Sequence, residues 1–154
     1  EAIDQVNEWI YHDINNGVYK SGFAHSQPAY DEAVTSLFAA LDRVEDILAK
    51  TRYLASNDQI TEADIRLFQT LVRFDEVYVV YFKCNIRSIS TYPNMHNYCR
   101  ELYQMPFVQK AVNIDHIKSH YFTSHAVHNS FSVVPRGPGA MAALLEPHDR
   151  TRFA

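Results

Sequence analysis

The feature that most constrains this chain is a run of apolar residues between Ser26 and Lys50. They recur every three or four positions, which places them on one face of an α-helix. Ser26 can cap the start of that helix, and Pro28 suits its first turn. The spacing predicts an amphipathic helix of about six turns, with these residues on its apolar face: Tyr30, Ala33, Val34, Leu37, Phe38, Leu41, Val44 and Leu48.

The beginning of the chain carries a second apolar stripe, formed by Ile3, Val6, Trp9 and Ile10. It predicts a helix from about Ala2 to Asn15. Asn and Gly accept the left-handed conformation at a helix end, so we expect Asn15-Asn16-Gly17 to end this helix. We expect a sharp bend over residues 18–25. Because the chain starts with Glu rather than Met and is periodic at once, we expect it to be cut from a longer protein.

The middle of the chain contains a helix-start signal at residues 60–65. Thr61 and Asp64 stand three positions apart and can satisfy each other's backbone N–H groups as a capping box. This predicts a helix through about Tyr81. Pro93 begins another helix, which Pro106 ends.

The other segments are less regular. Residues 82–91 form a polar connection, and residues 107–121 predict one or two short helices. Beyond His128 we expect an extended segment at residues 131–134, a loop at 135–139 and a polar tail at 146–154. Only four glycines are present, which disfavours a turn-rich β-sandwich. The sequence therefore predicts one all-α domain over residues 1–154.

Charge and composition exclude several classes of protein. The net charge is -4, with no basic stripe, so we expect no nucleic-acid partner. No apolar run approaches a membrane span, and no signal peptide is visible, so we expect no membrane association. The two cysteines, Cys84 and Cys99, do not make a disulfide framework. We interpret them as reduced thiols of a cytoplasmic protein.

Few residues suggest chemistry through a local motif. His116, His120, His125 and His128 cluster late in the chain, and zinc would need three or four ligands in tetrahedral array. We favour structural histidines and expect no metal. Cys84 follows Lys83, whose charge could lower a thiol pKa, but this hint is weak, and it is weaker still for Cys99.

The ten tyrosines are more informative. Tyr30, Tyr53, Tyr98 and Tyr103 fit the inner faces of predicted helices and read as core residues. Three others stand apart. Tyr19 lies at a predicted helix end, Tyr78 lies near the end of a strong helix, and Tyr121 follows His120 in the histidine-rich segment. Periodicity alone leaves these three open as hydrogen-bonding edges of a core or as site residues.

Several strings in this sequence resemble the glutathionyl-hydroquinone reductases, the Xi class of glutathione transferases. The resemblance covers essentially the whole chain. Its most specific parts are the N-N-G-V-Y-K-S-G-F-A string, the F-D-E-V-Y string and the H-I-K-S-H-Y string. The quoted strings lie in this order: residues 15–24, 61–68, 70–75, 77–78, 82–85, 102–106, 112–113, 116–118, 120–121 and 146–148.

The resemblance implies a glutathione-transferase C-terminal-like helical bundle with an extended C-terminal tail. In this family a thioredoxin-like N-terminal domain binds glutathione and carries the catalytic cysteine. Neither that domain nor its cysteine has a counterpart in this chain, so we expect the chain alone to be inactive. The family resemblance also implies a homodimer and a small aromatic glutathione conjugate as substrate.

By position in the strings, the family's acid/base tyrosine falls on Tyr19. Two further tyrosines that lower the cysteine pKa fall on Tyr78 and Tyr121. The implied reaction converts S-glutathionyl-hydroquinones to hydroquinones, with glutathione as co-substrate and oxidised glutathione as product. The alternative is a non-catalytic helical module of the same fold, used for dimerisation or assembly.

Overall fold

A computed structural model describes residues 1–153 of the chain. It contains helices joined by loops and, over these residues, no β-strand. The predicted all-α class is therefore confirmed. No helix in this range is long and apolar enough to cross a membrane. The elements are α1 (Ala2–Ile10), the π-helical turn η1 (Tyr11–Asn15), α2 (Gly17–Gly22), α3 (Gln27–Leu48), α4 (Glu62–Arg73), the π-helical turn η2 (Phe74–Tyr78), α5 (Val79–Tyr81), the 3₁₀ turn η3 (Ile89–Thr91), α6 (Pro93–Tyr103), α7 (Pro106–Ala111), α8 (Ile114–Ser124), and the 3₁₀ turns η4 (Ala140–Leu145) and η5 (Arg150–Phe153).

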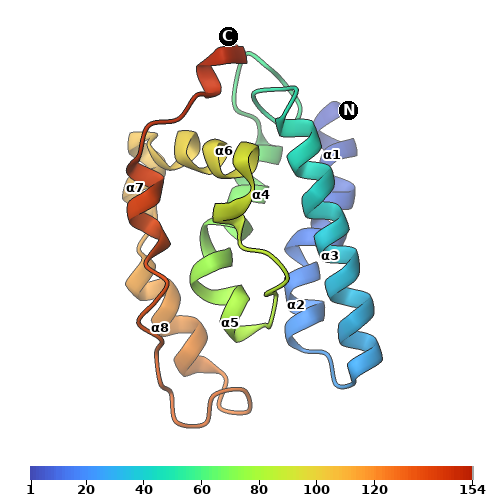
Figure 1. Ribbon diagram of the computed structural model, residues 1–154, viewed down its shortest axis with the longest axis vertical. Coiled ribbons are helices and arrows are strands. Elements are labelled where there is room, and N and C mark those ends of the chain that lie inside the picture. Colours follow the sequence, from blue (N-terminus) through green and yellow to red (C-terminus); the bar gives the residue numbers. More distant parts are fainter. Residues whose placement is uncertain (154) are drawn as a thin grey trace.

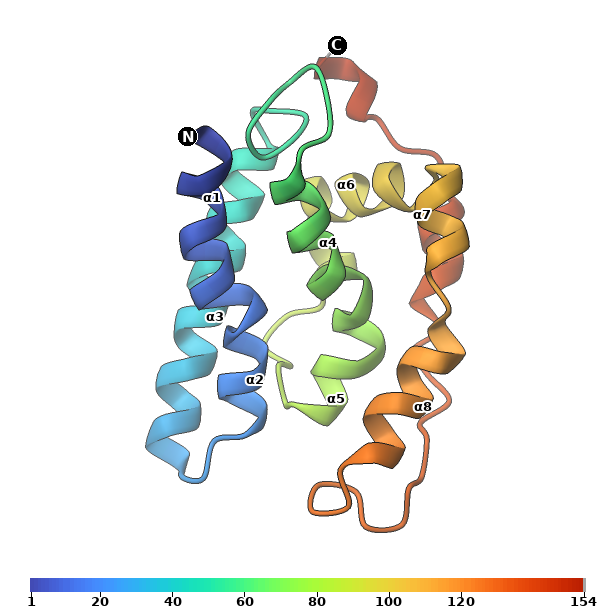
Figure 2. The same ribbon diagram turned by 180° about the vertical axis from the view of Figure 1, so that it is seen from behind.

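The helices form an upright bundle (Figures 1 and 2). The α1–α2 segment and α3 stand together on one side, α4 and α5 run through the middle, and α7 and α8 stand on the other side. Helix α6 crosses the bundle near the end that holds both termini. The C-terminal segment returns along α8 and α7 to the end of the bundle where the chain begins.

Helix α3 forms as the apolar spacing predicts. The Ser26 side chain accepts a hydrogen bond from the backbone N–H of Ala29 at 3.3 Å, and Pro28 lies in the first turn. Leu37, Leu41 and other residues of the stripe are buried in the core. Tyr53 and Tyr98 are likewise buried, as predicted for core tyrosines.

The predicted stop at Asn15-Asn16-Gly17 is wrong. The first helix passes through η1 and continues as α2 to Gly22, and the turn to α3 comes at residues 23–26. Gly17 has no left-handed backbone, and a Cβ there would lie at ordinary contact distance, 3.4 Å, from Leu37 Cδ1 of α3. The packing of α2 against α3 stabilises this continuation of the helix, and the local sequence pattern does not reveal that packing.

The capping box at Thr61 and Asp64 is confirmed. The buried Asp64 carboxylate accepts hydrogen bonds from the Thr61 backbone N–H at 2.8 Å and from its hydroxyl at 2.7 Å. It also accepts bonds from the Leu54 backbone N–H at 2.9 Å and from the Tyr98 hydroxyl at 3.0 Å. Asp64 thus ties the start of α4 to the preceding loop and to α6.

The end of the chain is not a free polar tail. Arg150 is fully buried and donates hydrogen bonds to the backbone carbonyls of Leu48, Thr51 and Arg52 at 2.5–2.7 Å. These carbonyls lie at and beyond the C-terminus of α3, where unpaired C=O groups and the helix dipole favour a cation. The segment around Phe131 is irregular and exposed, as expected for a chain that leaves the bundle.

Candidate functional site

Three tyrosine hydroxyls meet at one point of the bundle. The hydroxyl of Tyr121 lies 2.6 Å from that of Tyr19 and 2.8 Å from that of Tyr78. They come from three elements, α2, η2 and α8, and from positions 102 and 43 residues apart in the chain. The structure therefore brings together all three tyrosines that the sequence singled out.

The three hydroxyls form a chain that runs from the core to the surface. Tyr78 is 2% exposed, Tyr121 is 6% exposed and Tyr19 is 38% exposed. The buried Tyr78 hydroxyl makes its hydrogen bond to Tyr121. If Tyr78 donates to Tyr121 and Tyr121 donates to Tyr19, every buried hydroxyl proton has an acceptor. The Tyr19 proton then remains free to be donated outward.

Local backbone geometry places these side chains. Both long helices that supply the site contain a π-helical turn, η1 just before α2 and η2 at the end of α4. A π-turn inserts an extra residue into a helix, redirects the side chains that follow, and is frequent at functional sites. Tyr78 is the last residue of η2, and Tyr19 follows η1 by four residues. The Asn15 amide at the end of η1 donates to the Thr70 hydroxyl at 2.7 Å and holds the two helices together.

Aromatic rings frame the three tyrosines. The Phe82 ring stacks on Tyr78 at 5.4 Å with an interplanar angle of 9°, and lies 5.2 Å from the Tyr19 ring and 6.0 Å from the Tyr121 ring. Gly22 makes room for it, because a Cβ there would overlap Phe82 Cδ1 at 2.1 Å. Sequence reasoning missed Phe82 as part of this site, although its spacing of four residues from Tyr78 places both on one helical face.

Burial keeps the Tyr78 and Tyr121 hydroxyls protonated. It raises the pKa of Tyr121 to about 12, with the hydrogen bond to Tyr19 as a second cause and the Arg73 charge acting the other way. The pKa of Tyr78 is raised further, first by burial and then by its hydrogen bond to Tyr121. At neutral pH both groups are hydrogen-bond donors that can stabilise a nearby anion.

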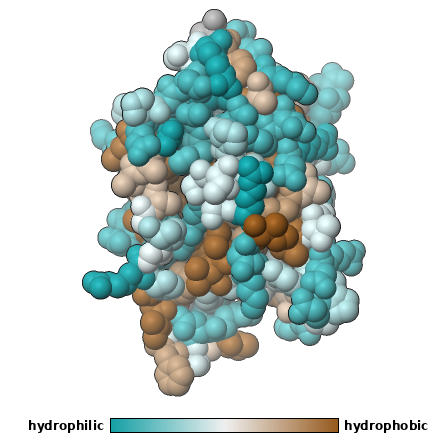
Figure 3. Space-filling view, viewed as in Figure 1, coloured by the Kyte–Doolittle hydropathy of each residue, from teal (hydrophilic) through white to brown (hydrophobic). Residues whose placement is uncertain are grey.

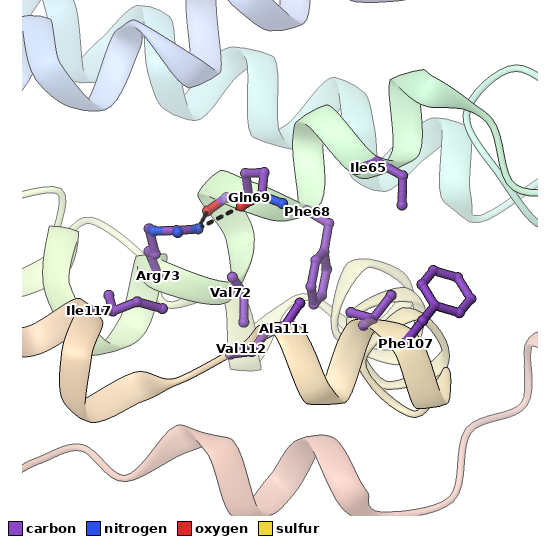
Figure 4. A pocket seen from close by; sticks show the side chains of 10 residues that line it. Ile65, Phe68, Gln69, Val72, Arg73, Phe107, Ala111, Val112 and Ile117 are labelled. Atoms are coloured by element: carbon purple, nitrogen blue, oxygen red, sulfur yellow. Dashed lines mark hydrogen bonds between the residues drawn. The ribbon is translucent and has the colours of Figure 1, made fainter.

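The tyrosines border an open hollow of about 320 Å³, whose rim includes Asn16, Gln69 and Arg73. Beside it lies an apolar groove of about 170 Å³ between α4 and α7 (Figure 4). Ile65, Phe68 and Val72 come from α4; Phe107, Val108, Ala111 and Val112 face them, and Ile117 lies beside Arg73.

The groove and the hollow are neighbours, because Gln69 and Arg73 line both. Arg73 is held there by hydrogen bonds to the Gln69 backbone oxygen at 2.6 Å and side-chain oxygen at 3.0 Å (Figure 4). At the far end of the groove the Phe107 side chain is 64% exposed. Patches of apolar and polar residues alternate over the face shown in Figure 3.

The other sequence candidates do not hydrogen-bond the three tyrosine hydroxyls. No group of three or more His, Cys, Asp or Glu side chains in residues 1–153 is placed to hold a metal ion. The His128 ring packs at 5.0 Å from Phe23, and the His125 ring at 6.0 Å from Tyr81. Cys84 and Cys99 are free and buried. Burial raises the pKa of Cys84 to about 12 and also raises that of Cys99, so neither is a poised nucleophile.

Comparison with known proteins assigns this arrangement to a family. The sequence profile of the glutathione S-transferase C-terminal domain matches residues 27–101. The chain is thus a helical C-terminal domain of the glutathione-transferase kind. Within that superfamily it belongs with the glutathionyl-hydroquinone reductases and the Xi-class transferases, which confirms the resemblance of its strings.

Three relatives support this assignment. Glutathionyl-hydroquinone reductase YqjG of Escherichia coli K12 is 54% identical over 148 residues, which are 96% of this chain and 44% of the relative. Its glutathione-bound structure superposes with a TM-score of 0.92, over 97% of this chain and 47% of that one, at 53% identity. Glutathionyl-hydroquinone reductase PcpF of Sphingobium chlorophenolicum is 47% identical over 88% of this chain and 43% of its own length. A Xi-class transferase from Natrialba magadii gives a TM-score of 0.93 at 47% identity, over 97% of this chain and 45% of that one. The chain spans less than half the length of each.

Proposed function

We propose that residues 1–154 form the substrate-covering helical domain of a glutathione-dependent reductase that converts S-glutathionyl-hydroquinones to hydroquinones. The observation that carries this proposal is the chain of three tyrosine hydroxyls, whose most exposed member, Tyr19, lies at the edge of an open hollow. Such a site can hold a thiolate on one side and deliver a proton to a leaving aromatic ring on the other.

The nucleophile in this proposal is a cysteine on a thioredoxin-like domain that this chain does not contain. Donor hydroxyls favour the charged form of a thiol. Because Tyr78 and Tyr121 donate along the chain of hydroxyls towards Tyr19, they lower the cysteine pKa by strengthening the outermost hydroxyl as a donor. The thiolate attacks the glutathione sulfur of the conjugate. The bond between that sulfur and the ring carbon breaks, and the carbon takes the electron pair and a proton from Tyr19. The hydroquinone leaves, and a mixed disulfide remains on the enzyme.

A second glutathione completes the cycle. Its thiolate attacks the mixed disulfide, oxidised glutathione leaves, and the cysteine thiolate is restored. Glutathione thus acts as the reductant, and the proton that its thiol gives up balances the one delivered to the ring. The glutathione-bound structure of YqjG and the names of both reductases support glutathione as the co-substrate.

The apolar groove suits the docking of the thioredoxin-like domain. Phe107 and its neighbours expose apolar side chains that a partner surface would cover. The groove also adjoins the tyrosine hollow at Gln69 and Arg73, so a domain seated on it could reach the hydroxyls. Relatives of more than twice this length leave room for such a domain. We further propose a homodimer located in the cytoplasm, where free thiols such as Cys84 persist.

The test is turnover of a glutathionyl-hydroquinone by the full-length protein and its Tyr19→Phe variant. We expect the variant to lose about 10²–10⁴-fold in kcat, as for other general-acid substitutions, while its melting temperature changes little. Tyr11→Phe is the matched control, since Tyr11 is also partly exposed in the same helical segment. Full activity in Tyr19→Phe would remove Tyr19 from the mechanism. A wild-type protein without turnover would favour a non-catalytic assembly module.

A further inference from the structure

A buried ion pair links the same two elements that carry Tyr78 and Tyr121. The Lys118 ammonium lies 3.3 Å from a carboxylate oxygen of Glu76, and the two side chains are 10% and 3% exposed. Glu76 stands in η2, two residues before Tyr78, and Lys118 stands in α8, three residues before Tyr121. Elements η2 and α8 are therefore joined twice, once by opposite charges and once by hydroxyls.

The pair also holds the returning C-terminal segment. Lys118 donates further hydrogen bonds to the backbone oxygens of Arg136 at 3.2 Å and Gly137 at 3.1 Å. The second oxygen of Glu76 accepts the backbone N–H of Ala140 at 2.5 Å. All three ammonium protons and both carboxylate oxygens thus have partners. Figures 1 and 2 show this segment running beside α8.

Stability alone is a poor reason for this arrangement. Removing two charges from water costs several kcal/mol per ion, and apolar residues of similar size often serve a core at least as well. A satisfied buried network does, however, restrict a structure to one geometry. Here the geometry in question is the register between η2 and α8, which sets whether the hydroxyls of Tyr78 and Tyr121 meet at 2.8 Å.

We propose that Glu76 and Lys118 are positioning residues of the tyrosine site. By fixing η2 against α8 and both against residues 136–140, they hold the Tyr78 and Tyr121 hydroxyls in contact and aim the tyrosine chain at the hollow. Their effect on turnover rests on the proposed function, but their effect on the tyrosine contact does not. The two can therefore be measured separately.

The experiment uses tyrosine labelled with ¹³C at Cζ in the full-length protein, with Tyr78 and Tyr121 signals assigned from Phe variants. The Glu76→Gln/Lys118→Gln double variant removes both charges without leaving one buried ion alone. Because the hydroxyls separate and Tyr121 loses the Tyr78 donor, we expect both signals to move and the Tyr121 signal to titrate at higher pH. We expect kcat to fall about 10–100-fold, as for a small misplacement of catalytic groups, with little change in KM.

Two further variants serve as controls. Lys118→Arg keeps the charge and should restore most of both readouts. Arg52→Gln/Glu101→Gln neutralises another buried pair, which joins a loop to α6 away from these hydroxyls. This variant should leave the Tyr78 and Tyr121 signals and kcat unchanged, even where it lowers stability as much as the Glu76/Lys118 variant does. The proposal is overturned if the Glu76/Lys118 variant leaves both signals unchanged, or if the Arg52/Glu101 variant shifts them as much. Shifted signals with unchanged kcat would uphold the positioning role and contradict the proposed chemistry.

Discussion

Asp64 and Glu76 are two buried carboxylates on one continuous helical segment, and they bind different kinds of partner. Asp64 accepts four hydrogen bonds, three of them from Leu54 and Thr61 close in sequence. Glu76 binds Lys118 and Ala140, which lie 42 and 64 residues further along the chain. The first fixes where a helix begins. The second fixes how the helix that carries Tyr78 meets the rest of the molecule.

The surroundings of Asp64 therefore stabilise the fold, whereas those of Glu76 adjoin the tyrosine site. Around Asp64, polar groups are satisfied by nearby backbone and by Tyr98. Around Glu76, the polar network ends next to hydroxyls that reach a surface hollow. We therefore expect substitutions at the Asp64 end to lower stability first, and substitutions at the Glu76 end to lower activity first.

The largest expected effect is that of Asp64→Ala. It leaves buried donors of Leu54, Thr61 and Tyr98 without an acceptor, and each such donor costs about 1–3 kcal/mol. We expect a loss of about 3–5 kcal/mol in the free energy of unfolding, measured by urea denaturation. Glu62→Ala, which removes an exposed pair with Arg66, should cost less than about 0.5 kcal/mol. Equal losses in both variants would contradict the role given to Asp64.

The next effect compares two glycines of α2. Gly22→Ala drives a methyl group into Phe82, and overpacking of this kind costs about 1–3 kcal/mol. Because Phe82 stacks on Tyr78, turnover should fall as well. Gly17→Ala meets Leu37 only at ordinary contact distance and gains helix propensity, so its stability should change by less than about 1 kcal/mol. Equal stability and turnover in the two variants would show that Phe82 does not support the site.

A smaller effect concerns alkaline pH. The pKa of Tyr121 is about 12 in the folded protein against about 10 when unfolded, so the folded state holds this proton more tightly. The resulting stability is complete below pH 10 and is lost as the pH rises towards 12. Between pH 9 and pH 11 the loss from this one group is about 1.3 kcal/mol. In Tyr121→Phe, the free energy of unfolding from urea denaturation should therefore fall by about 1.3 kcal/mol less between pH 9 and pH 11 than in the wild type. The same fall in both proteins would contradict the burial of the Tyr121 hydroxyl.

Much of the fold could be predicted from the sequence because its signals are local. The apolar spacing of α3 and the capping box of α4 each specify a helix within a few residues. The continuation of the first helix through Gly17 could not be predicted in this way, since packing against Leu37 overrides a string that favours a helix end. The burial of Arg150 depends on carbonyls about 100 residues earlier.

For the site too, residues with a local signal could be predicted and residues joined by long-range contacts could not. Tyr19, Tyr78 and Tyr121 were named through the resemblance of three strings, while their periodicity left them open. Phe82 could have been found from its helical spacing to Tyr78. The Glu76–Lys118 pair could not, because nothing in the sequence near either residue indicates the other. The catalytic roles of Tyr19, Tyr78 and Tyr121 stay predictions.

We propose above that these hydroxyls stabilise a thiolate on the thioredoxin-like domain. The most direct measurement is the pH dependence of alkylation of that cysteine in the full-length protein, in the wild type and in Tyr121→Phe, with Tyr103→Phe as control. Loss of one donor, directly or through the chain that it holds, should raise the cysteine pKa by about one unit, and the control should not. A cysteine pKa that is the same in all three proteins would contradict the account.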